Sequence, residues 1–352
     1  MKAELALVGE RSVGQLSPKR KEKEAILKVF KEQQEEQRIT DVVTKLQHFG
    51  EWVKWDAASQ LDRKWHSLLA YESDSQLSFL LNATEDSLPT PSNLRRWNKP
   101  VDKMCPHGCG SVASLRHILT GCRRAEKPQW CVTWRHDSVL YAIYKAVVRV
   151  TNRFKETQAK EKRDRKPKTV EVVSFKTESG AATFDAPRAP TVEKVLDEAR
   201  DWNVKFDIDV SNQGKDDLFP AEILETSAHR PDGVIWSMSA KTVVWIELTC
   251  PWEENMSKWH FEKKKKYNQL KIDCEAKGWK VHPLEVEVGC RGYASQNSFY
   301  RMCKVLGVLR REREELKRAV EQTALHCSHV IFCHRFKKDW EERPPLDVSS
   351  WH

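Results

Sequence analysis

Two acidic residues, Asp232 and Glu247, lie at the ends of a segment that is typical of a β-hairpin. Residues 233–237 and 242–249 are apolar and rich in β-branched side chains, and the turn-prone segment 237–241 joins them. Folding of such a hairpin brings the residues near its open end together, so the two carboxylates can share one cation. Paired hard oxygen ligands suit magnesium or manganese, and such an ion activates water against a phosphodiester. The pair therefore predicts a metal-dependent hydrolytic site.

A second group of residues has the spacing of a zinc site, C-x3-C-x7-H-x4-C, formed by Cys105, Cys109, His117 and Cys122. Zinc binds thiolates and imidazole in a closed tetrahedron, and four protein ligands leave no open position for catalysis. The metal would supply the folding energy that a segment of about 30 residues lacks from its own core. His107, inside the first turn, is the alternative nitrogen ligand.

Another Cys/His-rich patch lies at residues 326–334. It has no recognisable ligand spacing, and true metal sites are scarce among such patches. An amphipathic terminal segment is the better interpretation.

Alternating strand-like and helical stretches follow residue 170, and this pattern predicts an α/β layer fold with the sheet inside. Strands are expected at 170–176, 204–210, 233–237, 242–249 and 280–288, and helices at 191–201, 253–277, 296–309 and 311–325. Before that point, helical spacing covers 40–85 and 137–150. Residues 151–169 hold eight Lys or Arg and three acids with almost nothing apolar, which is typical of a linker.

The chain therefore divides into six expected segments. They are a disordered or exposed charged helical segment (1–40), a helical region (41–94), a CCHC zinc knuckle with its following helix (95–150), a basic linker (151–169), an α/β domain (170–325) and a C-terminal tail (326–352).

Composition limits the classes of function. The net charge of +9 permits an acidic polymer as partner without requiring one. The first residues have no signal-peptide pattern, and nowhere do eighteen apolar residues run together, so no membrane span is expected. In this setting the ten cysteines favour thiols or metal ligands over a disulfide framework. A nuclear or cytoplasmic location is the default expectation.

The order of the motifs is more distinctive than any one of them. It begins with Asp-Ser-Leu-Pro-Thr (86–90), Asn-Leu-Arg-Arg-Trp (93–97) and the knuckle, followed by Trp-Arg-His-Asp-Ser-Val-Leu (134–140). Arg-Pro-Asp (230–232) comes next, then Glu247 after fourteen intervening residues, and last Glu-Lys-Lys-Lys-Lys-Tyr (262–267). This series resembles the C-terminal part of the polyprotein of site-specific non-LTR retrotransposons of the restriction-like-endonuclease type. The likeness covers roughly residues 50–310.

The resemblance implies a PD-(D/E)XK-like restriction-endonuclease domain over 170–325 that nicks DNA to prime reverse transcription. It implies zinc on the knuckle, catalytic magnesium or manganese on Asp232 and Glu247, and DNA as the partner, with the element's RNA as a second candidate. A DNA-acting protein would lie in the nucleus.

Further residues receive nucleic-acid roles from the resemblance or from their position beside the knuckle. Arg135, His136 and Asp137 match an Arg-His-Asp motif that either positions DNA or supports the nuclease core. Arg123 and Arg124, beside the knuckle, are expected to grip the duplex.

The nuclease pattern places a lysine two residues after the second carboxylate, and this chain has Thr249 there. The helix expected at 253–277 offers a replacement, because Lys263, Lys266 and Tyr267 share one face at i, i+3 and i+4. Helix-face reasoning places Lys263 ahead of Lys266 as the catalytic lysine. A solvated lysine-rich surface is the alternative, and Tyr267 either touches substrate or packs against the sheet.

Upstream, the first hundred residues have no room for a reverse transcriptase core, so the chain resembles a truncated or domesticated remnant. Two other classes of function compete with a metal-dependent endonuclease. One is a catalytically inactive nucleic-acid-binding remnant, and the other is a protein-interaction module that uses the helical N-terminal region.

Overall fold

The structure is a computed structural model that describes residues 18–45, 73–122, 131–163, 194–208, 219–225, 229–336 and 344–348. The chain forms two compact units, Met1–Asp62 and Arg63–His352, which are described separately. Within the described residues, every helix is too short or too polar to span a lipid bilayer.

In the first unit the described part is one helix, α1 (Pro18–Lys45). The charged helix predicted from Pro18 is present and continues seven residues beyond Arg38. Its side chains are largely exposed, and pairs one turn apart, such as Lys28 with Glu32 and Lys45 with Asp41, link opposite charges along its surface.

The second unit is a mixed α/β structure built on a five-stranded sheet. The strands are β1 (Asn203–Phe206), β2 (Gly233–Ser237), β3 (Thr242–Thr249), β4 (Lys280–Gly289) and β5 (Tyr293–Ala294), in spatial order 1-2-3-4-5. β3 and β4 run parallel, and the other neighbours are antiparallel. The α/β class predicted from the alternation of elements is thus confirmed at this level.

The predicted hairpin is present as β2 and β3, with pairing from Gly233 opposite Ile246 to Ser237 opposite Thr242. Its turn is fixed from outside by Asp201, whose carboxylate accepts hydrogen bonds from the Ser237 hydroxyl and the Ser239 backbone amide. These bonds lower the pKa of Asp201 to about 2 against the opposing effect of burial.

A parallel pair requires a crossover connection, and β3 and β4 are joined by η4 (Glu253–Asn255), α7 (Met256–Lys266) and α8 (Asn268–Ala276). The single helix predicted at 253–277 is therefore broken. The break falls at Tyr267, whose ring is 1% exposed and packs near the ring of Trp245 on β3.

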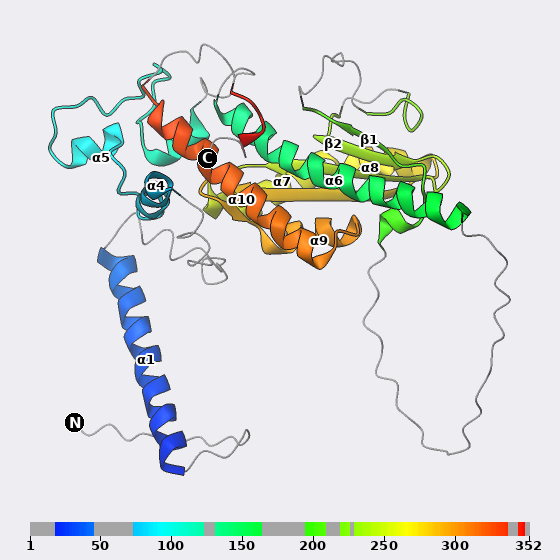
Figure 1. Cartoon of the computed structure of the whole chain (residues 1–352). Coiled ribbons are helices and arrows are strands. Elements are labelled where there is room, and N and C mark those ends of the chain that lie inside the picture. Colours follow the sequence, from blue (N-terminus) through cyan, green and yellow to red (C-terminus); the bar gives the residue numbers. More distant parts are fainter. Residues whose placement is uncertain are drawn as a thin grey trace. The chain divides into compact units, whose positions relative to one another are not determined.

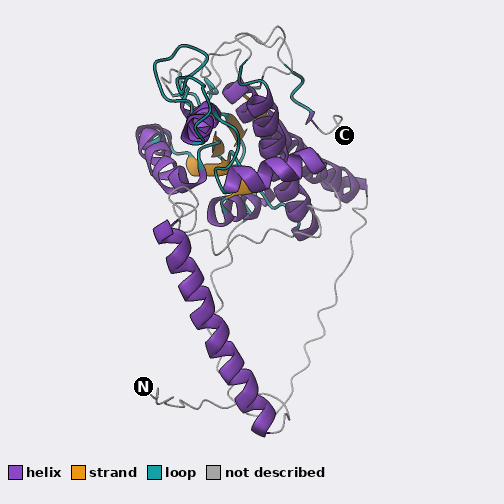
Figure 2. Ribbon diagram, turned by 90° about the vertical axis from the view of Figure 1, so that its left-hand side faces the viewer, coloured by secondary structure: helices purple, strands orange, loops and turns teal. Residues whose placement is uncertain are grey.

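Helices cover both faces of the sheet (Figures 1 and 2). One face carries α6 (Cys131–Arg163), α9 (Gln296–Val305) and α10 (Arg310–Cys333), with Ile143, Phe299 and Val320 packed on alternate residues of β3 and β4. The opposite face is covered by α7 and α8, where Tyr267, Leu270 and Cys274 meet Val243 and Trp245. Alternation along β3 therefore decides which side chains face the crossover helices.

Two short helices precede the cysteine-rich segment. α4 (Asp74–Thr84) begins with a capping box between Ser73 and Gln76, and α5 (Pro91–Arg96) begins after the Thr90 cap. Of the helical region predicted over 41–94, residues 46–72 lie outside the described part of the chain.

Several predicted boundaries are wrong for identifiable reasons. The linker expected from 151 is still helix as far as Arg163, and Arg153 is anchored by the Glu312 carboxylate and the Gly307 carbonyl. Of the helix expected at 191–201, the described residues 194–201 form only one 3-10 turn, Val195–Asp197. α10 extends to Cys333 and so takes in most of the 326–334 patch, as an amphipathic segment would. The strand predicted at 170–176 lies outside the described residues.

The ends of β3 and β4 are held by a buried ion pair. Arg291 and Glu253 are 2% and 0% exposed, with Nε and Oε2 2.7 Å apart, and the Arg291 guanidinium lies 3.7 Å from the centre of the Trp252 ring. Burial alone would disfavour this guanidinium, but the charges of Glu253 and Glu254 outweigh it and raise the pKa of Arg291.

Replacing Arg291 by methionine should lower the free energy of unfolding by about 3–5 kcal/mol, because it leaves a buried carboxylate without its counter-charge. Urea unfolding followed by circular dichroism measures the change. The matched control is Arg311→Met, since Arg311 is 92% exposed beside Glu315 and its removal should cost less than about 0.5 kcal/mol. Equal midpoints for the two variants would contradict the expectation.

Candidate metal and carboxylate centres

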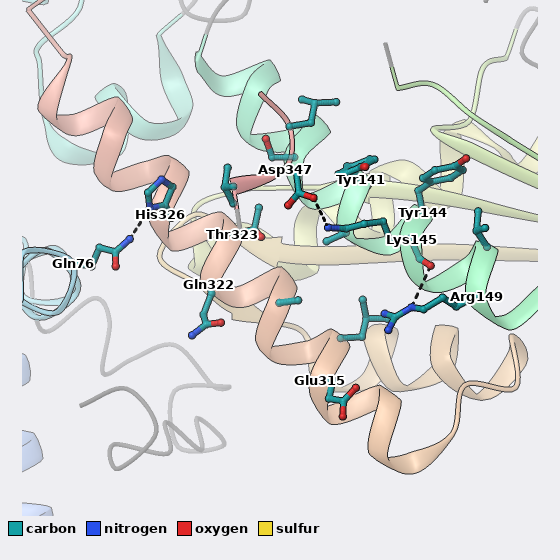
Figure 3. Close-up of a pocket in the computed structure, with 17 residues that line it drawn as sticks. Gln76, Tyr141, Tyr144, Lys145, Arg149, Glu315, Gln322, Thr323, His326 and Asp347 are labelled. Carbon is teal, nitrogen blue, oxygen red and sulfur yellow. Dashed lines mark hydrogen bonds and ion pairs between the residues drawn. The ribbon is translucent and has the colours of Figure 1, made fainter. Parts of the chain in front are cut away.

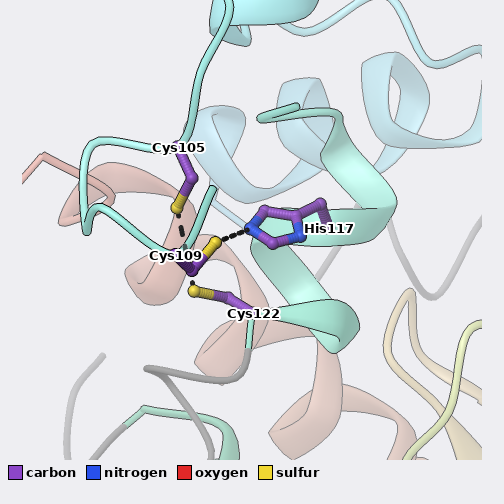
Figure 4. A group of neighbouring side chains, drawn as sticks. All are labelled: Cys105, Cys109, His117 and Cys122. Carbon is purple, nitrogen blue, oxygen red and sulfur yellow. Dashed lines mark hydrogen bonds between the residues drawn. The ribbon is translucent and has the colours of Figure 1, made fainter. Parts of the chain in front are cut away.

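The four predicted thiol and imidazole ligands come together in one group (Figure 4). Their ligand atoms all lie within 4.8 Å of one another, with Cys105 Sγ 3.7 Å from Cys122 Sγ and Cys109 Sγ 3.2 Å from His117 Nε2. His107, the alternative nitrogen ligand, is not a member of this group.

Local backbone geometry explains how the chain brings them together. Gly108 and Gly110 adopt positive φ of 67° and 80°. These conformations let the chain turn sharply between Met104 and Val112, which pair in an antiparallel bridge. His117 and Cys122 lie at the start of the single helical turn His117–Gly121 and just after it.

The donor set fits a metal ion. Burial raises the pKa of the Cys105 thiol to about 12, so a metal-free thiolate is disfavoured there and a bound cation would reverse the balance. Burial, assisted by the nearby His107, lowers the pKa of His117, which keeps its imidazole neutral at pH 7, as ligation requires. Three sulfurs and one nitrogen in a closed group are compatible with a structural zinc site.

Asp232 and Glu247 form the second centre, at the open end of the β2–β3 hairpin. The pairing of Gly233 with Ile246, extended by one residue, sets Asp232 opposite Glu247. The Asp232 carboxylate accepts a hydrogen bond of 2.7 Å from the Leu248 backbone amide. Burial, and then the charge of Asp232, raise the pKa of Glu247, so the two carboxylates interact.

Both candidate lysines reach Glu247 from the last turn of α7. Lys263 Nζ donates a hydrogen bond to Glu247 Oε1, and Lys266 Nζ lies 3.7 Å from the same oxygen. Glu247 is only 2% exposed, and its other oxygen, Oε2, has no hydrogen-bond partner among the described residues. A buried carboxylate oxygen in that state is poised to bind a cation or a proton.

Tyr267 packs against the sheet and does not face solvent. Its hydroxyl accepts from Lys266 Nζ at 2.8 Å and donates to the Arg230 carbonyl at 2.9 Å, and its ring is 1% exposed. Of the two roles predicted for it, contact with nucleic acid is therefore wrong, because no surface is available.

The Arg-His-Asp motif divides between core and centre. Arg135 is 0% exposed and donates hydrogen bonds to the carbonyls of Leu119 and Cys250 and to the Ser328 hydroxyl. A guanidinium so enclosed cannot contact DNA. Of the two roles predicted for the motif, support of the core is the one that fits Arg135.

His136 and Asp137 lie at the carboxylate centre, with His136 Nε2 3.3 Å from Asp232 Oδ2. Burial disfavours the charged form of His136, but the charge of Asp232 outweighs it and raises the pKa of His136 well above its ordinary value. The same pairing lowers the pKa of Asp232 against its own burial. Arg123 and Arg124 lie outside the described residues.

Two further buried acids lie on β4, the strand next to Glu247, and sequence reasoning missed them. Glu285 on β4 pairs with Glu247 across the parallel register, and Glu287 accepts from His260 at 2.9 Å and from Ser298 at 2.6 Å. The available signal was the pair of acids two residues apart inside an apolar strand, since such spacing places both on one buried face.

A further hollow lies elsewhere, between α6 and α10. It is a cavity of about 600 Å³ lined by residues that include Tyr141, Tyr144 and Thr323, and Lys145 pairs with Asp347 at its rim (Figure 3). None of the thiol, imidazole or carboxylate groups of the two centres lines it.

Comparison with known proteins adds no assignment to this geometry. No protein-family model matches the chain, and no curated protein matches it.

The Cys/His group should bind one tetrahedral metal ion. Titration of the reduced protein with cobalt(II) should give thiolate charge-transfer and visible d–d bands that saturate near roughly one equivalent. Cys122→Ser should abolish this saturation, whereas Cys333→Ser, which alters an exposed thiol, should leave it intact. Less than about half an equivalent in the wild type would contradict the assignment.

His260 should titrate above its ordinary pKa of 6.5, because its hydrogen bond to Glu287 outweighs its partial burial. A raised folded pKa means that this contact stabilises the fold below about pH 6.5 and that the contribution is lost as pH rises through the folded value. Proton NMR of the ring measures the pKa, and Glu287→Gln should return it toward 6.5. An unchanged titration in that variant would refute the attribution.

Proposed function

We propose that the protein is a divalent-metal-dependent DNA endonuclease with a PD-(D/E)XK-like core and a structural zinc knuckle, related to the C-terminal region of site-specific non-LTR retrotransposon polyproteins. One observation carries the proposal. The buried Glu247 interacts with the charge of Asp232, carries an oxygen that has no hydrogen-bond partner within the described part of the chain, and is contacted by Lys263 from the crossover helix.

The sheet supports this assignment by its order of elements. The resemblance implies a hairpin bearing two carboxylates, with a lysine-bearing helix after it. The chain has both elements, and a strand parallel to β3 follows them. Thr249 stands where the usual lysine would be, and Lys263 brings an ammonium to Glu247 from the crossover helix instead. In this proposal the catalytic lysine comes from α7 and not from β3, but its ammonium group still lies beside the second carboxylate.

Asp232 and Glu247 are the residues that would hold magnesium or manganese, which when bound lowers the pKa of water and stabilises a leaving oxygen. Glu247 would offer Oε2, for which none of the described residues is a hydrogen-bond partner. Lys263 supplies a fixed positive charge where charge develops on the phosphate, and its position beside two acids keeps it oriented. Lys266, half exposed at the mouth of the centre, can meet the same phosphate.

DNA would approach along α7, which ends in four consecutive lysines. Lys258, Lys264 and Lys265 are exposed on this helix, and such side chains bind the phosphate backbone without reading sequence. The zinc knuckle would stiffen the neighbouring segment, and a nuclear location follows from the substrate.

A catalytically inactive nucleic-acid-binding remnant is the second candidate. The lack of a lysine at position 249, which is Thr249, and the direct ion pair between Lys263 and Glu247 favour it, because that pair neutralises the carboxylate and occupies one of its two oxygens. Salt-dependent DNA retention without nicking would identify this state.

Supercoiled plasmid incubated with the zinc-loaded protein and magnesium should be converted to nicked circles. The combined Asp232→Ala and Glu247→Ala changes should abolish nicking, and Lys263→Met should slow it by about 100-fold or more, because a stabilising charge at the reacting phosphate is lost. Gel quantification of nicked circles over time measures the rates.

The matched control is Lys264→Met, which removes an exposed lysine of the same helix and should reduce the rate by less than about tenfold. Nicking that persists in the double carboxylate variant would remove the metal-site assignment. Absence of nicking in the wild type would leave the inactive remnant.

A further inference from the structure

His136 contacts three groups at the carboxylate centre from the first turns of α6. Its Nδ1 lies 2.9 Å from Asp137 Oδ1, and its Nε2 lies 3.3 Å from Asp232 Oδ2 and 3.2 Å from the Leu248 carbonyl oxygen. The side chain is 25% exposed, so the ring is mostly buried at this position.

Asp232 depends on such contacts because it lies one residue before β2, which begins at Gly233. Its backbone carbonyl accepts from the Asp207 amide, but this leaves the side chain free to rotate. Oδ2 is held by the Leu248 amide on one side and faces the His136 ring on the other. Two partners restrain the position of this oxygen more tightly than the amide alone would.

The ring itself is held in place by its neighbour in sequence. Arg135 joins the carbonyls of Leu119, at 2.9 Å, and Cys250, at 3.2 Å. Cys250 lies two residues beyond Leu248, so the same helical turn that carries His136 is tied to the end of β3. His136 therefore meets Asp232 from a rigid element.

We propose that His136 is a positioning residue: it clamps the Asp232 carboxylate against the Leu248 amide and so sets where a cation can be held between Asp232 and Glu247. The inference rests on the proposed function, in which those two acids bind the ion. Partners that orient metal-binding groups typically change metal affinity by 10–100-fold when they are removed.

Two amide substitutions separate the contacts of the ring. In His136→Asn the amide nitrogen takes the place of Nδ1 and keeps a donor for Asp137, but it does not reach Asp232. In His136→Gln the amide reaches the place of Nε2 and can donate to Asp232. A positioning role predicts that the glutamine variant is the milder of the two.

Manganese affinity of the full-length, zinc-loaded protein, measured by the loss of the free-ion EPR signal, provides the test without reliance on nicking. We expect His136→Asn to weaken binding by about 10–100-fold and His136→Gln by less than about fivefold. His260→Gln is the control, because His260 also contacts a buried acid, Glu287, yet does not contact Asp232 or Glu247, and it should bind as the wild type does.

Each alternative result is decisive. Wild-type affinity in His136→Asn, or equal losses in the Asn, Gln and His260 variants, would overturn the positioning role while leaving the proposed function in place. A wild type that binds no manganese, or an Asp232→Ala variant that binds it equally well, would remove the proposed function and the positioning role together.

Discussion

The burial of the Glu247 carboxylate is the constraint on which the second unit depends. A carboxylate 2% exposed in an otherwise apolar strand is unstable unless a positive charge reaches it. The charge comes from Lys263, which follows Glu247 by sixteen residues, so the chain must leave β3 and run back over the sheet as α7. The crossover that joins the two parallel strands therefore also supplies the positive charge that balances the buried carboxylate.

Arg135 explains how the Cys/His group and the carboxylate centre share one framework. Its guanidinium stands where the turn before Cys122, the end of β3 and α10 meet, and its hydrogen bonds reach all three. A lysine could not replace it, because a rigid planar fork is needed to donate in several fixed directions at once. The Arg-His-Asp motif therefore contributes to both centres. Arg135 connects them from within the core, and His136 contacts Asp232.

Predictions succeeded where the signal was local. The limits of β2 and β3 follow from two short β-branched runs around a turn, and the four metal ligands follow from spacing within eighteen residues. Predictions failed where a distant partner decided the outcome. Residues 151–163 have the composition of a linker. The helix nevertheless continues, because Arg153 pairs with a carboxylate of α10 and the Thr151 hydroxyl donates to a carbonyl of its own helix.

Residue type was also a poor guide to burial. Arg135 and Tyr267 have side chains that bind nucleic acid in many proteins, and here both are enclosed: the terminal nitrogens of Arg135 and the hydroxyl of Tyr267 form hydrogen bonds inside the fold. Glu285 and Glu287 escaped notice for the converse reason, since acids inside an apolar strand acquire meaning only when the neighbouring strand places Glu247 beside them.

The amino-acid order alone determined the hairpin, its two acids and the Cys/His ligand set, because strand periodicity and tight ligand spacing act over a few residues. Tertiary structure decided which lysine meets Glu247, that His136 faces Asp232, and that Arg135 is internal. Those contacts join residues from 16 to 193 positions apart. They form only when helices pack against both faces of the sheet, so no local sequence pattern predicts them.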